Sequence, residues 1–352
     1  MQTKKQIQQL LASAGVFPNK RLGQHFLIDL NLMRLLVDSA HIRNNDIVLE
    51  VGCGTGSLTE ALAGRAGMVI AVERDKVLAQ IAKTQLALYR SGAGRARAKN
   101  ILVRGTPLTG GPKVRIINTD ILETKSTINR AVIKAIQLCR KIRGTPLNGE
   151  YAGRILLVAN LPYNAASPVI LNLLTGPVTA DGMYVTVQKE VAQRITAAPG
   201  QRHYGTLSIF LAAAGDVKTI RVLKPTVFWP QPKVDSAMVS FVRKKKKASR
   251  IHNFELFSNV VSLFLQHRRK MLKTCTKFFT GKPAIRTAGK LAEIDDWPEI
   301  FKQCSIDPTK RPDQLSPEDY IAIANLSAKR AADLCHRYLC HRYRSSEQLN
   351  RK

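Results

Sequence analysis

The sequence has few acidic residues for its length. Its 352 residues contain 25 aspartates and glutamates against 55 lysines and arginines, which gives a formal net charge of +30 at pH 7. A surface with such an excess of positive charge attracts polyanions, and nucleic acid is the most common polyanion in a cytoplasm. The net positive charge therefore predicts a nucleic-acid partner but does not identify which kind of nucleic acid.

Long apolar runs and paired cysteines are also missing. No apolar run reaches the roughly 18 residues needed to cross a bilayer, which excludes a membrane-spanning protein. Residues 1–20 contain no apolar signal core, and their short helical pattern argues against a transit peptide. The six cysteines form no Cys-x-x-Cys pair, so we expect reduced thiols in a cytoplasmic protein, and neither a disulfide framework nor a zinc ribbon.

The fractions of hydrophobic and charged residues are typical of a globular protein. Hydrophobic residues make up 45% of the chain and charged residues 23%, which excludes a disordered or fibrous chain. At roughly 150 residues per domain, the length suggests about two domains. The basic run 243–247 separates a sheet-like region from one with helical spacing. We therefore place the boundary near residue 245, with a smaller all-α domain over 246–352.

Apolar runs in the first domain, 1–245, alternate with helical stretches and end in glycine or polar residues. The pattern predicts an α/β domain with a Rossmann-like parallel sheet, in which ligands bind beyond the carboxyl ends of the strands. The runs are 46–51, 68–72, 114–117, 155–159 and 183–187. Two stretches between them, 90–115 and 125–154, each hold seven basic residues and are predicted to be inserted surface loops or short helices.

A glycine-rich turn follows the first of these runs. Glu50 leads into Gly52, Gly54 and Gly56, and glycine lets the backbone turn sharply and lets a ligand approach it closely. The spacing is neither the Gly-x-Gly-x-x-Gly of dinucleotide enzymes nor the Gly-Lys-Ser/Thr of a phosphate loop. Taken alone, the turn is explained almost as well by a purely structural role.

Single carboxylates close the second and third runs. Glu73 lies 21 residues after Gly52, where a carboxylate can accept hydrogen bonds from both ribose hydroxyls. Asp120 is placed to accept a hydrogen bond from the amino group of an adenine. Either acid alone could be a helix cap. Together with the turn, they indicate an adenosine-containing ligand without a pyrophosphate, and S-adenosylmethionine fits that description.

The most specific signal in the chain is the sequence Asn160, Leu161, Pro162 and Tyr163 after the fourth run. The exocyclic amine of adenine is a poor nucleophile because its lone pair is delocalised into the ring. The Asn160 side-chain oxygen and the Leu161 carbonyl can accept its hydrogens and favour a nucleophilic geometry. Pro162 fixes the turn, and Tyr163 can stack on an extruded base. Because a sulfonium leaving group is already activated, neither a metal nor a strong general base is required.

Several segments in this order resemble the rRNA adenine-N6 dimethyltransferases. The segments are Lys20–Leu27 (KRLGQHFL), the Gly52 turn, Asn160–Asn164 (NLPYN), Gln188–Val191 (QKEV), Phe228–Ser236 (FWPQPKVDS), His267–Lys270 (HRRK) and parts of Ile306–Glu318. The most similar branch is the small-subunit enzyme linked to kasugamycin sensitivity. The similarity runs from about residue 20 to 327 and leaves out the two basic insertions.

The resemblance implies an S-adenosylmethionine-dependent methyltransferase domain and a helical RNA-binding domain with a basic tail. It implies N6,N6-dimethylation of two adjacent adenines near the 3′ end of small-subunit rRNA in immature small ribosomal subunits, with no obligate protein partner. The cofactor residues that it implies are His25, Leu27, Gly52, Gly54, Glu73, Asp120 and Asn160. The implied catalytic residues are Asn160, Leu161, Pro162 and Tyr163, and the implied RNA contacts are Phe228, Lys233, Arg268, Arg269 and Lys270.

The chain departs from the family pattern in two places. Ala165, Ala166 and Ser167 replace the usual Ile-Ser-Ser/Thr after the tyrosine, which predicts a slightly larger pocket. The spacers from Glu73 to Asp120 and from Asp120 to Asn160 are longer than usual, so the mode of ribosome docking is open.

Two other functions remain as alternatives. One is the large-subunit rRNA methyltransferase of macrolide resistance, against which the Arg311-Pro312 segment and the long helical domain count. The other is a non-catalytic RNA-binding assembly factor or the related mitochondrial transcription factor, against which the intact strand-end motifs count. The repeated Cys-His-Arg-Tyr at 335–338 and 340–343 matches no zinc spacing and is better explained as a basic helical tail. The lysines 244–247 fit a solvated linker and a phosphate contact about equally well.

Overall fold

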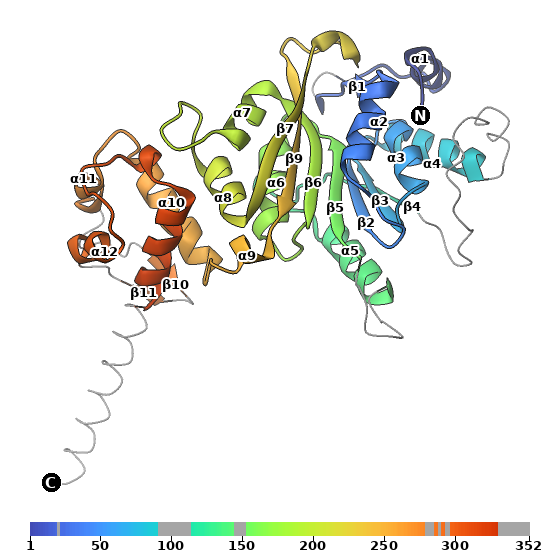
Figure 1. Ribbon diagram of the computed structural model, residues 1–352. Helices are drawn as coiled ribbons and strands as arrows, with labels where there is room; N and C mark the ends of the chain where they lie inside the picture. The colour runs from blue at the N-terminus through green and yellow to red at the C-terminus, as the bar shows by residue number, and fades with distance from the viewer. Residues whose placement is uncertain are drawn as a thin grey trace, which may run out of the picture. The chain divides into compact units, whose positions relative to one another are not determined.

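The structure, a computed structural model, describes residues 1–19, 22–90, 114–143, 153–278, 285–287, 290–292 and 296–329 (Figure 1). The chain forms two compact units. The first contains Met1–Gln193 and Asp216–Arg243, and the second contains Arg194–Gly215 and Lys244–Lys352. Within the described ranges, no helix is long and apolar enough to cross a membrane.

The described part of the first unit is centred on a seven-stranded sheet in the order β4-β3-β2-β5-β6-β9-β7. The pairs from β4 to β6 are parallel, whereas β9 is antiparallel to β6. The strands are β2 (Ile47–Val51), β3 (Met68–Glu73), β4 (Val114–Asn118), β5 (Ile155–Asn160), β6 (Gly182–Gln188), β7 (Gly215–Leu223) and β9 (Ser236–Arg243). The predicted α/β class is thus confirmed. Strand β2 has β3 on one side and β5 on the other, so the connections that follow β2 first run in one direction along the sheet and later in the opposite one. In sheets of this kind, a ligand crevice lies at the point where the direction changes, here the carboxyl end of β2.

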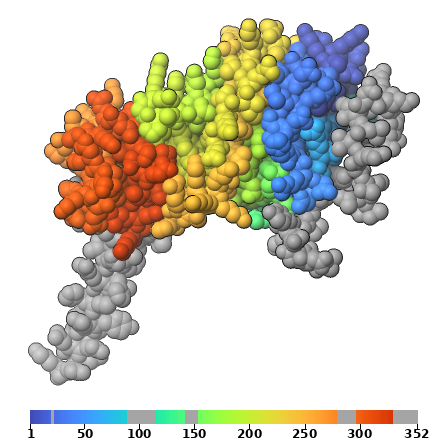
Figure 2. Space-filling view, in the orientation of Figure 1, coloured from blue at the N-terminus to red at the C-terminus, as the bar shows by residue number. Residues whose placement is uncertain are grey.

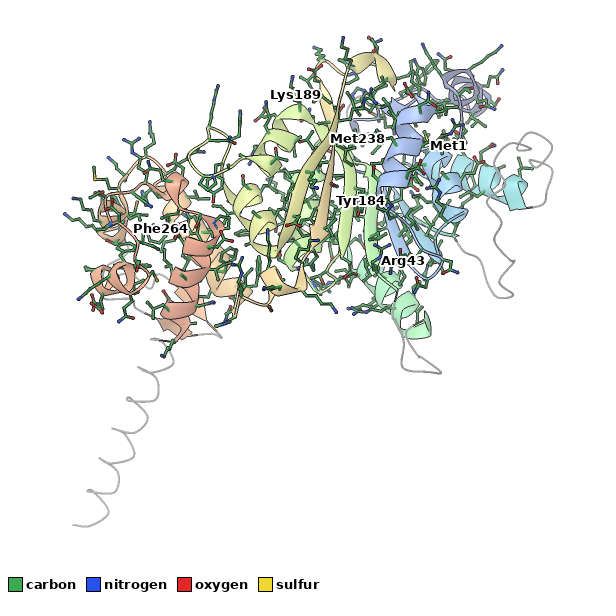
Figure 3. All side chains as sticks on the ribbon, in the orientation of Figure 1. Met1, Arg43, Tyr184, Lys189, Met238 and Phe264 are labelled. Atoms are coloured by element: carbon green, nitrogen blue, oxygen red, sulfur yellow. The ribbon has the colours of Figure 1, made fainter. Side chains whose placement is uncertain are left out.

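Hydrophobic burial on both faces explains why these runs form central strands. All five residues of β2 are buried, and so are the first five of β5. Helices α2 (Leu30–Ser39), α3 (Ser57–Ala63), α4 (Lys76–Arg90) and α5 (Arg130–Arg143) pack against the sheet, while α6 (Ala166–Thr175) connects β5 to β6. Tyr184 of β6 and Met238 of β9, labelled in Figure 3, lie in the resulting core.

The second predicted insertion, 125–154, is only partly an insertion. Its residues 130–143 form α5, which packs against β2 and β3 and buries Val132, Ala135 and Ile136. The basic side chains of Lys134 and Arg140 lie on the same helix, and that of Arg140 is exposed. Helix α5 is therefore an amphipathic helix that packs its apolar face against the sheet and presents basic residues on its outer face. Residues 91–113 of the first predicted insertion and 144–152 of the second lie outside the described residues.

A buried ion pair fixes the amino ends of β2 and β5. Asp46 is fully buried, and Arg154 donates to its two carboxylate oxygens through Nε at 3.2 Å and Nη2 at 2.6 Å. The backbone carbonyl of Asp46 accepts hydrogen bonds from Gly67 and Met68, which begin the approach to β3. One aspartate thus connects three neighbouring strands, at the end of the sheet opposite the crevice.

Two short strands join distant parts of the first unit. Strand β1 (Phe26–Leu27) pairs antiparallel with β8 (Phe228–Trp229), which follows the 3₁₀ turn η3 (Pro225–Val227). In Figure 2 the yellow segment that contains β8 lies directly against the blue N-terminal part of the chain, as this pairing requires. Helix α1 (Lys4–Ser13) precedes β1 and packs Ile7 and Leu11 against Leu78.

Where the structure describes the second unit, it is helical except for one hairpin. The helices are α8 (Thr206–Ala214), α9 (Lys245–Ala248), α10 (Phe254–Gln266), α11 (Leu272–Thr276), α12 (Trp297–Gln303) and the helix over 317–329, with the 3₁₀ turn η4 (Pro312–Gln314). The hairpin of β10 (Ile285–Thr287) and β11 (Lys290–Ala292) is a departure from the all-α prediction. Phe264, labelled in Figure 3, packs edge-on against Trp297 in the core of this unit.

The placement of α8 also changes the predicted domain boundary. The assignment of 1–245 to the first domain included residues 194–215, which the structure groups with the second unit. The reason is that α8 is apolar around most of its circumference and needs helical neighbours. Its Phe210 contacts Phe254 and Phe257 of α10, with ring centroids 5.4 Å apart in both pairs. Helix α7 (Lys189–Thr196) contains the crossing between the units.

Candidate active site

The carboxyl ends of β2, β3, β4 and β5 surround an open cavity of roughly 1270 Å³, part of which is open to solvent. Its lining combines apolar side chains with a few convergent polar groups, as is typical of a small-molecule site. All predicted cofactor residues and the whole 160–163 motif line it. These residues are His25, Leu27, Gly52, Gly54, Glu73, Asp120, Asn160, Leu161, Pro162 and Tyr163.

The glycine-rich turn has the left-handed backbone that requires glycine. The φ angles of Gly52, Gly54 and Gly56 are +75°, +56° and +85°. A Cβ atom on Gly54 would lie 2.8 Å from the Phe26 ring, and one on Gly52 would lie 3.2 Å from the Pro162 ring. The glycines therefore let the backbone bend and also admit the side chains that form two walls of the cavity.

Glu73 is held rigidly at the end of β3. Its Oε2 accepts from the Gly54 N–H at 2.8 Å, and its Oε1 accepts from the Asp75 N–H at 2.9 Å. Burial raises the pKa of the Glu73 carboxyl above its ordinary value, although these backbone hydrogen bonds oppose that shift. Since a carboxylate has about four acceptor sites, the remaining ones can receive the two hydroxyls of a ribose.

Asp120 lies after β4 and already has a basic partner. Its Oδ1 accepts from the Leu122 N–H at 3.0 Å, and Arg74 Nη1 lies 3.1 Å from its Oδ2. Arg74 also lines the cavity, directly after Glu73. Sequence reasoning missed Arg74, although its place next to a predicted ribose-binding acid was a usable signal.

Asn160 has a fixed orientation with an unused acceptor. Its Nδ2 donates to the backbone carbonyl of His25 at 2.7 Å. Since that carbonyl can only accept, the amide must direct its Oδ1 the other way. This Oδ1 is buried and has no partner among the described residues. Buried acceptors without partners are rare in folded proteins, so the atom points to a donor that comes with a ligand.

Tyr163 is supported from two sides. Its ring stacks on His25 with centroids 5.4 Å apart and an interplanar angle of 26°. Its hydroxyl lies 2.7 Å from Oγ of Ser236, which is fully buried, and His25 Nδ1 lies 2.7 Å from the Pro230 carbonyl oxygen. Burial raises the pKa of Tyr163. The 228–236 segment thus supplies a hydrogen-bond partner for each ring, Ser236 for Tyr163 and Pro230 for His25.

The same segment corrects one predicted RNA contact. Phe228 is 1% exposed and belongs to the core, where its strand pairs with Leu27. No face of its ring is left to stack on a base. Trp229 is half-buried instead and stacks on Phe26 with centroids 6.2 Å apart. Lys233 is exposed and does not line the cavity.

The other predicted RNA contacts lie in the second unit. Arg268 has a structural role there, because its Nη2 donates to the carbonyls of Gln201 and Arg202 and its Nε to Asp313. Arg269 and Lys270 are exposed. Unlike Arg268, their side chains have no hydrogen bond or ion pair to another described residue. Their contact with RNA stays a prediction.

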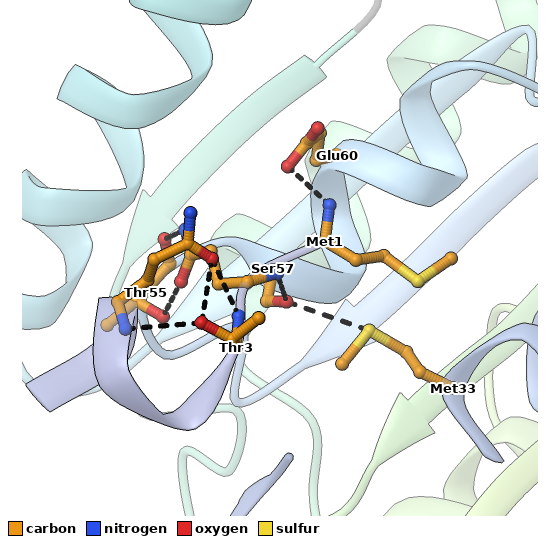
Figure 4. A network of polar contacts seen from close by, with 8 residues as sticks. Met1, Thr3, Met33, Thr55, Ser57 and Glu60 are labelled. Carbon is orange, nitrogen blue, oxygen red and sulfur yellow. Dashed lines mark hydrogen bonds and ion pairs between the residues drawn. The ribbon is translucent and has the colours of Figure 1, made fainter. Parts of the chain in front are cut away.

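The N-terminal segment is a part of the site that sequence reasoning missed. The Gln2 N–H donates to Ser57 Oγ at 2.7 Å, and the Gln2 side chain exchanges two hydrogen bonds with Thr55, through the Thr55 hydroxyl and the Thr55 carbonyl. The Met1 amino group also pairs with Glu60 (Figure 4). Ile7 of α1 lines the cavity. The Thr3-x-x-Gln6 capping box was the signal available in the sequence for this helix.

Two further titratable groups sit in the cavity wall. Glu50 is 1% exposed, and burial, together with the charge of Glu73, raises its pKa to about 8. Burial also raises the pKa of the Cys53 thiol well above its ordinary value, so the thiol is neutral and a poor nucleophile. In the described part of the chain, no three His, Cys, Asp or Glu side chains gather as a metal site would require.

Residues 17–294 match the family described as "Ribosomal RNA adenine dimethylase". Among similar curated proteins is the "Ribosomal RNA small subunit methyltransferase A" of Geobacillus sp. (strain WCH70). It is 32% identical over 320 residues, which cover 90% of this chain and 94% of that protein. The protein of the same name from Latilactobacillus sakei subsp. sakei (strain 23K) is 32% identical over 316 residues, covering 90% and 92%.

Two solved structures share the fold. A dimethyladenosine transferase from Plasmodium falciparum aligns with a TM-score of 0.61 at 21% identity, over 87% of this chain and 98% of that one. The 23S rRNA methyltransferase ErmE aligns with a TM-score of 0.52 at 18% identity, over 85% and 98%. At these identities the likeness establishes the Rossmann-like fold and carries no statement about the substrate.

Proposed function

Because this chain belongs to the ribosomal RNA adenine dimethylase family, we propose that it dimethylates N6 of adenines in small-subunit rRNA. The methyl donor is S-adenosylmethionine, and the substrate is the immature small ribosomal subunit. By the family resemblance, the target is two adjacent adenines near the 3′ end of that rRNA. The cytoplasmic location predicted above follows from the same premise and stays a prediction.

One observation carries the proposal. Asn160 Oδ1 is a buried, oriented acceptor without a partner among the described residues, at the end of the strand next to β2. The exocyclic amine of adenine offers two hydrogens in the plane of the base. An acceptor at Asn160 and another at the Leu161 carbonyl would receive them, and the ring of Tyr163 would cover one face of the base.

The residues present also fit the methyl donor. Glu73 can hold the ribose hydroxyls, Asp120 can accept from the adenine amine, and the glycines admit a ligand close to the backbone. When bound, S-adenosylmethionine supplies a methyl group that is already activated for transfer. What the chain contributes is position: Asn160 and Leu161 orient the amine, and Tyr163 fixes the base.

The same acceptors allow a second transfer. The first methylation releases one amine proton to solvent and leaves one amine hydrogen, so one of the two acceptors suffices to orient the nitrogen. The other side of the amine then has to accommodate a methyl group. Ala165 at the edge of the cavity is smaller than the residue usual in the family, which leaves space there.

The test is methyl transfer with purified protein. Immature small subunits and isotope-labelled S-adenosylmethionine should yield N6,N6-dimethyladenine in the small-subunit rRNA, detected by mass spectrometry of nuclease digests. Mature large subunits serve as the control substrate. Label confined to large-subunit RNA would contradict the substrate, and no label in either RNA would contradict the activity.

A further inference from the structure

Phe278, in the second unit, is an aromatic side chain that the site described above does not use. It follows helix α11, labelled in Figure 1, and is 46% exposed, although phenylalanine is a residue type that folding normally buries. Its ring stacks on that of His267 at the end of α10, with centroids 4.4 Å apart and an interplanar angle of 8°. Because His267 covers one face of the ring, the exposed part includes the opposite face, which is open to another planar group.

The backbone around Phe278 is fixed by hydrogen bonds and by burial of its neighbours. The Phe278 N–H donates to the Cys275 carbonyl at 3.0 Å, and the Leu272 N–H donates to the Lys310 carbonyl at 2.8 Å. The side chains of Leu272 and Cys275 are fully buried and attach α11 to the core of the second unit. The fold therefore presents the open face of the ring in a defined direction.

Phe278 lies in a strongly basic part of the second unit. The segments 267–278 and 307–311 lie side by side, since the Lys273 N–H donates to the Pro308 carbonyl at 3.0 Å. Asp307 is the one acidic residue in these two segments. Their exposed basic residues are Arg269, Lys270, Lys273, Lys277, Lys310 and Arg311. Such a surface attracts polyanions.

An open aromatic face within a basic surface matches the chemistry of single-stranded nucleic acid. Lysine and arginine contact phosphates, and an aromatic ring stacks on a base whatever the sequence. In a duplex the neighbouring bases cover both faces of each base, so a protein ring can stack only on an unpaired one. An acidic peptide would satisfy the charges but would leave the ring of Phe278 without an aromatic partner.

We propose that Phe278, backed by His267, is a stacking site for an unpaired base of the RNA substrate, outside the cavity that receives the methylated adenine. The inference rests on the function proposed above for the identity of that RNA. Basic residues alone bind any RNA through its phosphates. The ring adds a requirement for an accessible base, so the second unit selects RNA with an unpaired nucleotide at this point.

The direct test uses the full-length variant F278W, because tryptophan fluorescence is quenched when a base stacks on the indole. The probe is a single-stranded oligoadenylate of about eight nucleotides, and the parent protein corrects for Trp229 and Trp297. We expect quenching beyond that of the parent with this probe. We expect none with the same strand in a duplex, or with inorganic polyphosphate, which binds by charge alone.

Two results of this measurement would overturn the inference. One is the absence of additional quenching in F278W, whether or not the oligoadenylate binds. The other is equal quenching by polyphosphate, which has no base to stack.

Substitutions then separate the ring from the charges. F278A should weaken the binding of oligoadenylate and of immature small subunits roughly 5- to 150-fold, the range expected for one stacked base, without changing the dependence of affinity on salt. F278Y should stay within about threefold of the parent because it keeps the ring. K273A should instead flatten the salt dependence by about 0.7 log unit per log unit of salt, the value for one phosphate contact on a single strand.

M271A is the matched control for F278A. Met271 is 44% exposed, close to the value for Phe278, but it has no aromatic ring. Its loss should change either affinity by less than about threefold. Equal weakening by M271A and F278A would indicate a general apolar contact and would contradict base stacking.

Methyl transfer distinguishes the failure of this inference from the failure of the proposed function. With immature small subunits, F278A should raise KM by about the factor by which it weakens binding and should leave kcat within about twofold, since Phe278 does not line the cavity. An unchanged KM would remove Phe278 as a contact of the substrate. A parent protein that stacks oligoadenylate on Phe278 but transfers no methyl group would contradict the proposed function and leave the stacking site standing.

Discussion

The side-chain amide of Asn160 donates to the backbone carbonyl of His25, which lies 135 residues earlier in the chain, at 2.7 Å. This hydrogen bond determines which end of the amide faces the cavity. The acceptor Oδ1 is thereby oriented before any substrate binds, and orientation of this kind is what enzymes use to lower a barrier without reorganisation. The motif at 160–163 and the one at 20–27 are therefore joined in one structural element.

Asn160→Ala should lower the rate of methyl transfer by about 100- to 1000-fold, because one oriented hydrogen-bond partner of the amine is lost. Asn160→Asp is the sharper variant. It keeps the acceptor but loses the donor to His25, and its carboxylate would face that carbonyl. We expect Asn160→Asp to lose activity as well. Single-turnover kinetics measure the rate, and unchanged RNA binding is the control; full activity of Asn160→Asp would show that the His25 contact is dispensable.

Tyr163→Phe should retain most activity, whereas Tyr163→Ala should lose roughly tenfold or more in kcat/KM, since base stacking on an aromatic ring contributes about 1–3 kcal/mol. Ser236→Ala tests the support of the ring separately. It leaves the half-buried Tyr163 without its hydroxyl partner at 2.7 Å, so we expect a modest loss that Tyr163→Phe abolishes in the double variant. An equal loss in Tyr163→Phe and Tyr163→Ala would assign the role to the hydroxyl instead.

The stability of the ligand-free protein should depend on pH through Glu50. The pKa of Glu50 is about 8 in the fold against an ordinary value of 4.5. The folded state therefore binds the proton more tightly, and the free energy of unfolding contributed by this group falls as pH rises from about 5 to about 8. Glu50→Gln should be similar to the parent near pH 5 and more stable by a few kcal/mol above pH 8, because a tenfold difference in proton affinity corresponds to about 1.4 kcal/mol.

Urea unfolding at the two pH values measures this effect, with the exposed Glu190→Gln as the matched control. Glu190→Gln should change stability equally little at both pH values. If Glu50→Gln were less stable than the parent at high pH, Glu50 would be a stabilising carboxylate with a partner in the fold.

Gln2→Ala should detach the N-terminal segment from the glycine turn. The variant leaves the Thr55 hydroxyl and carbonyl without their partners, at a cost of about 1–3 kcal/mol. Since Ile7 of the same segment lines the cavity, we expect the dissociation constant for S-adenosylmethionine to rise several-fold and amide exchange in residues 1–13 to accelerate. The exposed Gln8→Ala is the control and should change neither quantity. Unaltered binding by Gln2→Ala would make the network purely structural.

Arg154→Ala should destabilise the first unit by about 3 kcal/mol or more, because it leaves the carboxylate of Asp46 buried and unpaired. Arg65→Ala is the matched control. Arg65 pairs with the more exposed Asp38, and such a pair contributes less than about 1 kcal/mol. Denaturant unfolding compares the two, and methyl transfer by the folded fraction of Arg154→Ala should be retained because the ion pair lies at the opposite end of the strands. Equal effects of the two variants would contradict the structural role given to Asp46.

Local patterns in the sequence were sufficient for the five parallel strands β2 to β6 and for the residues at their ends, but they did not predict β7 and β9. Runs such as 155–159 are apolar throughout because a central parallel strand is buried on both faces, and the polar residue that follows marks where the strand leaves the core. For that reason Glu73, Asp120 and Asn160 were found from the sequence, and the structure brings them to one cavity. The membership of 194–215 in the second unit was not predictable in this way, because the partner of α8 is α10, far along the chain.

The sequence by itself determined the class of sheet, the glycine turn and the chemical character of each strand end, since these follow from neighbouring residues and from periodicity. Only the tertiary structure decided which residues each side chain contacts. Phe228 is in the core because β8 pairs with β1, Arg268 is committed to backbone carbonyls and Asp313, and Gln2 is attached to Thr55. The pKa of Glu50 is raised for the same kind of reason. It depends on burial, on the hydrogen bond from Thr59 and on the charge of Glu73, which are set by tertiary packing and not by any local pattern.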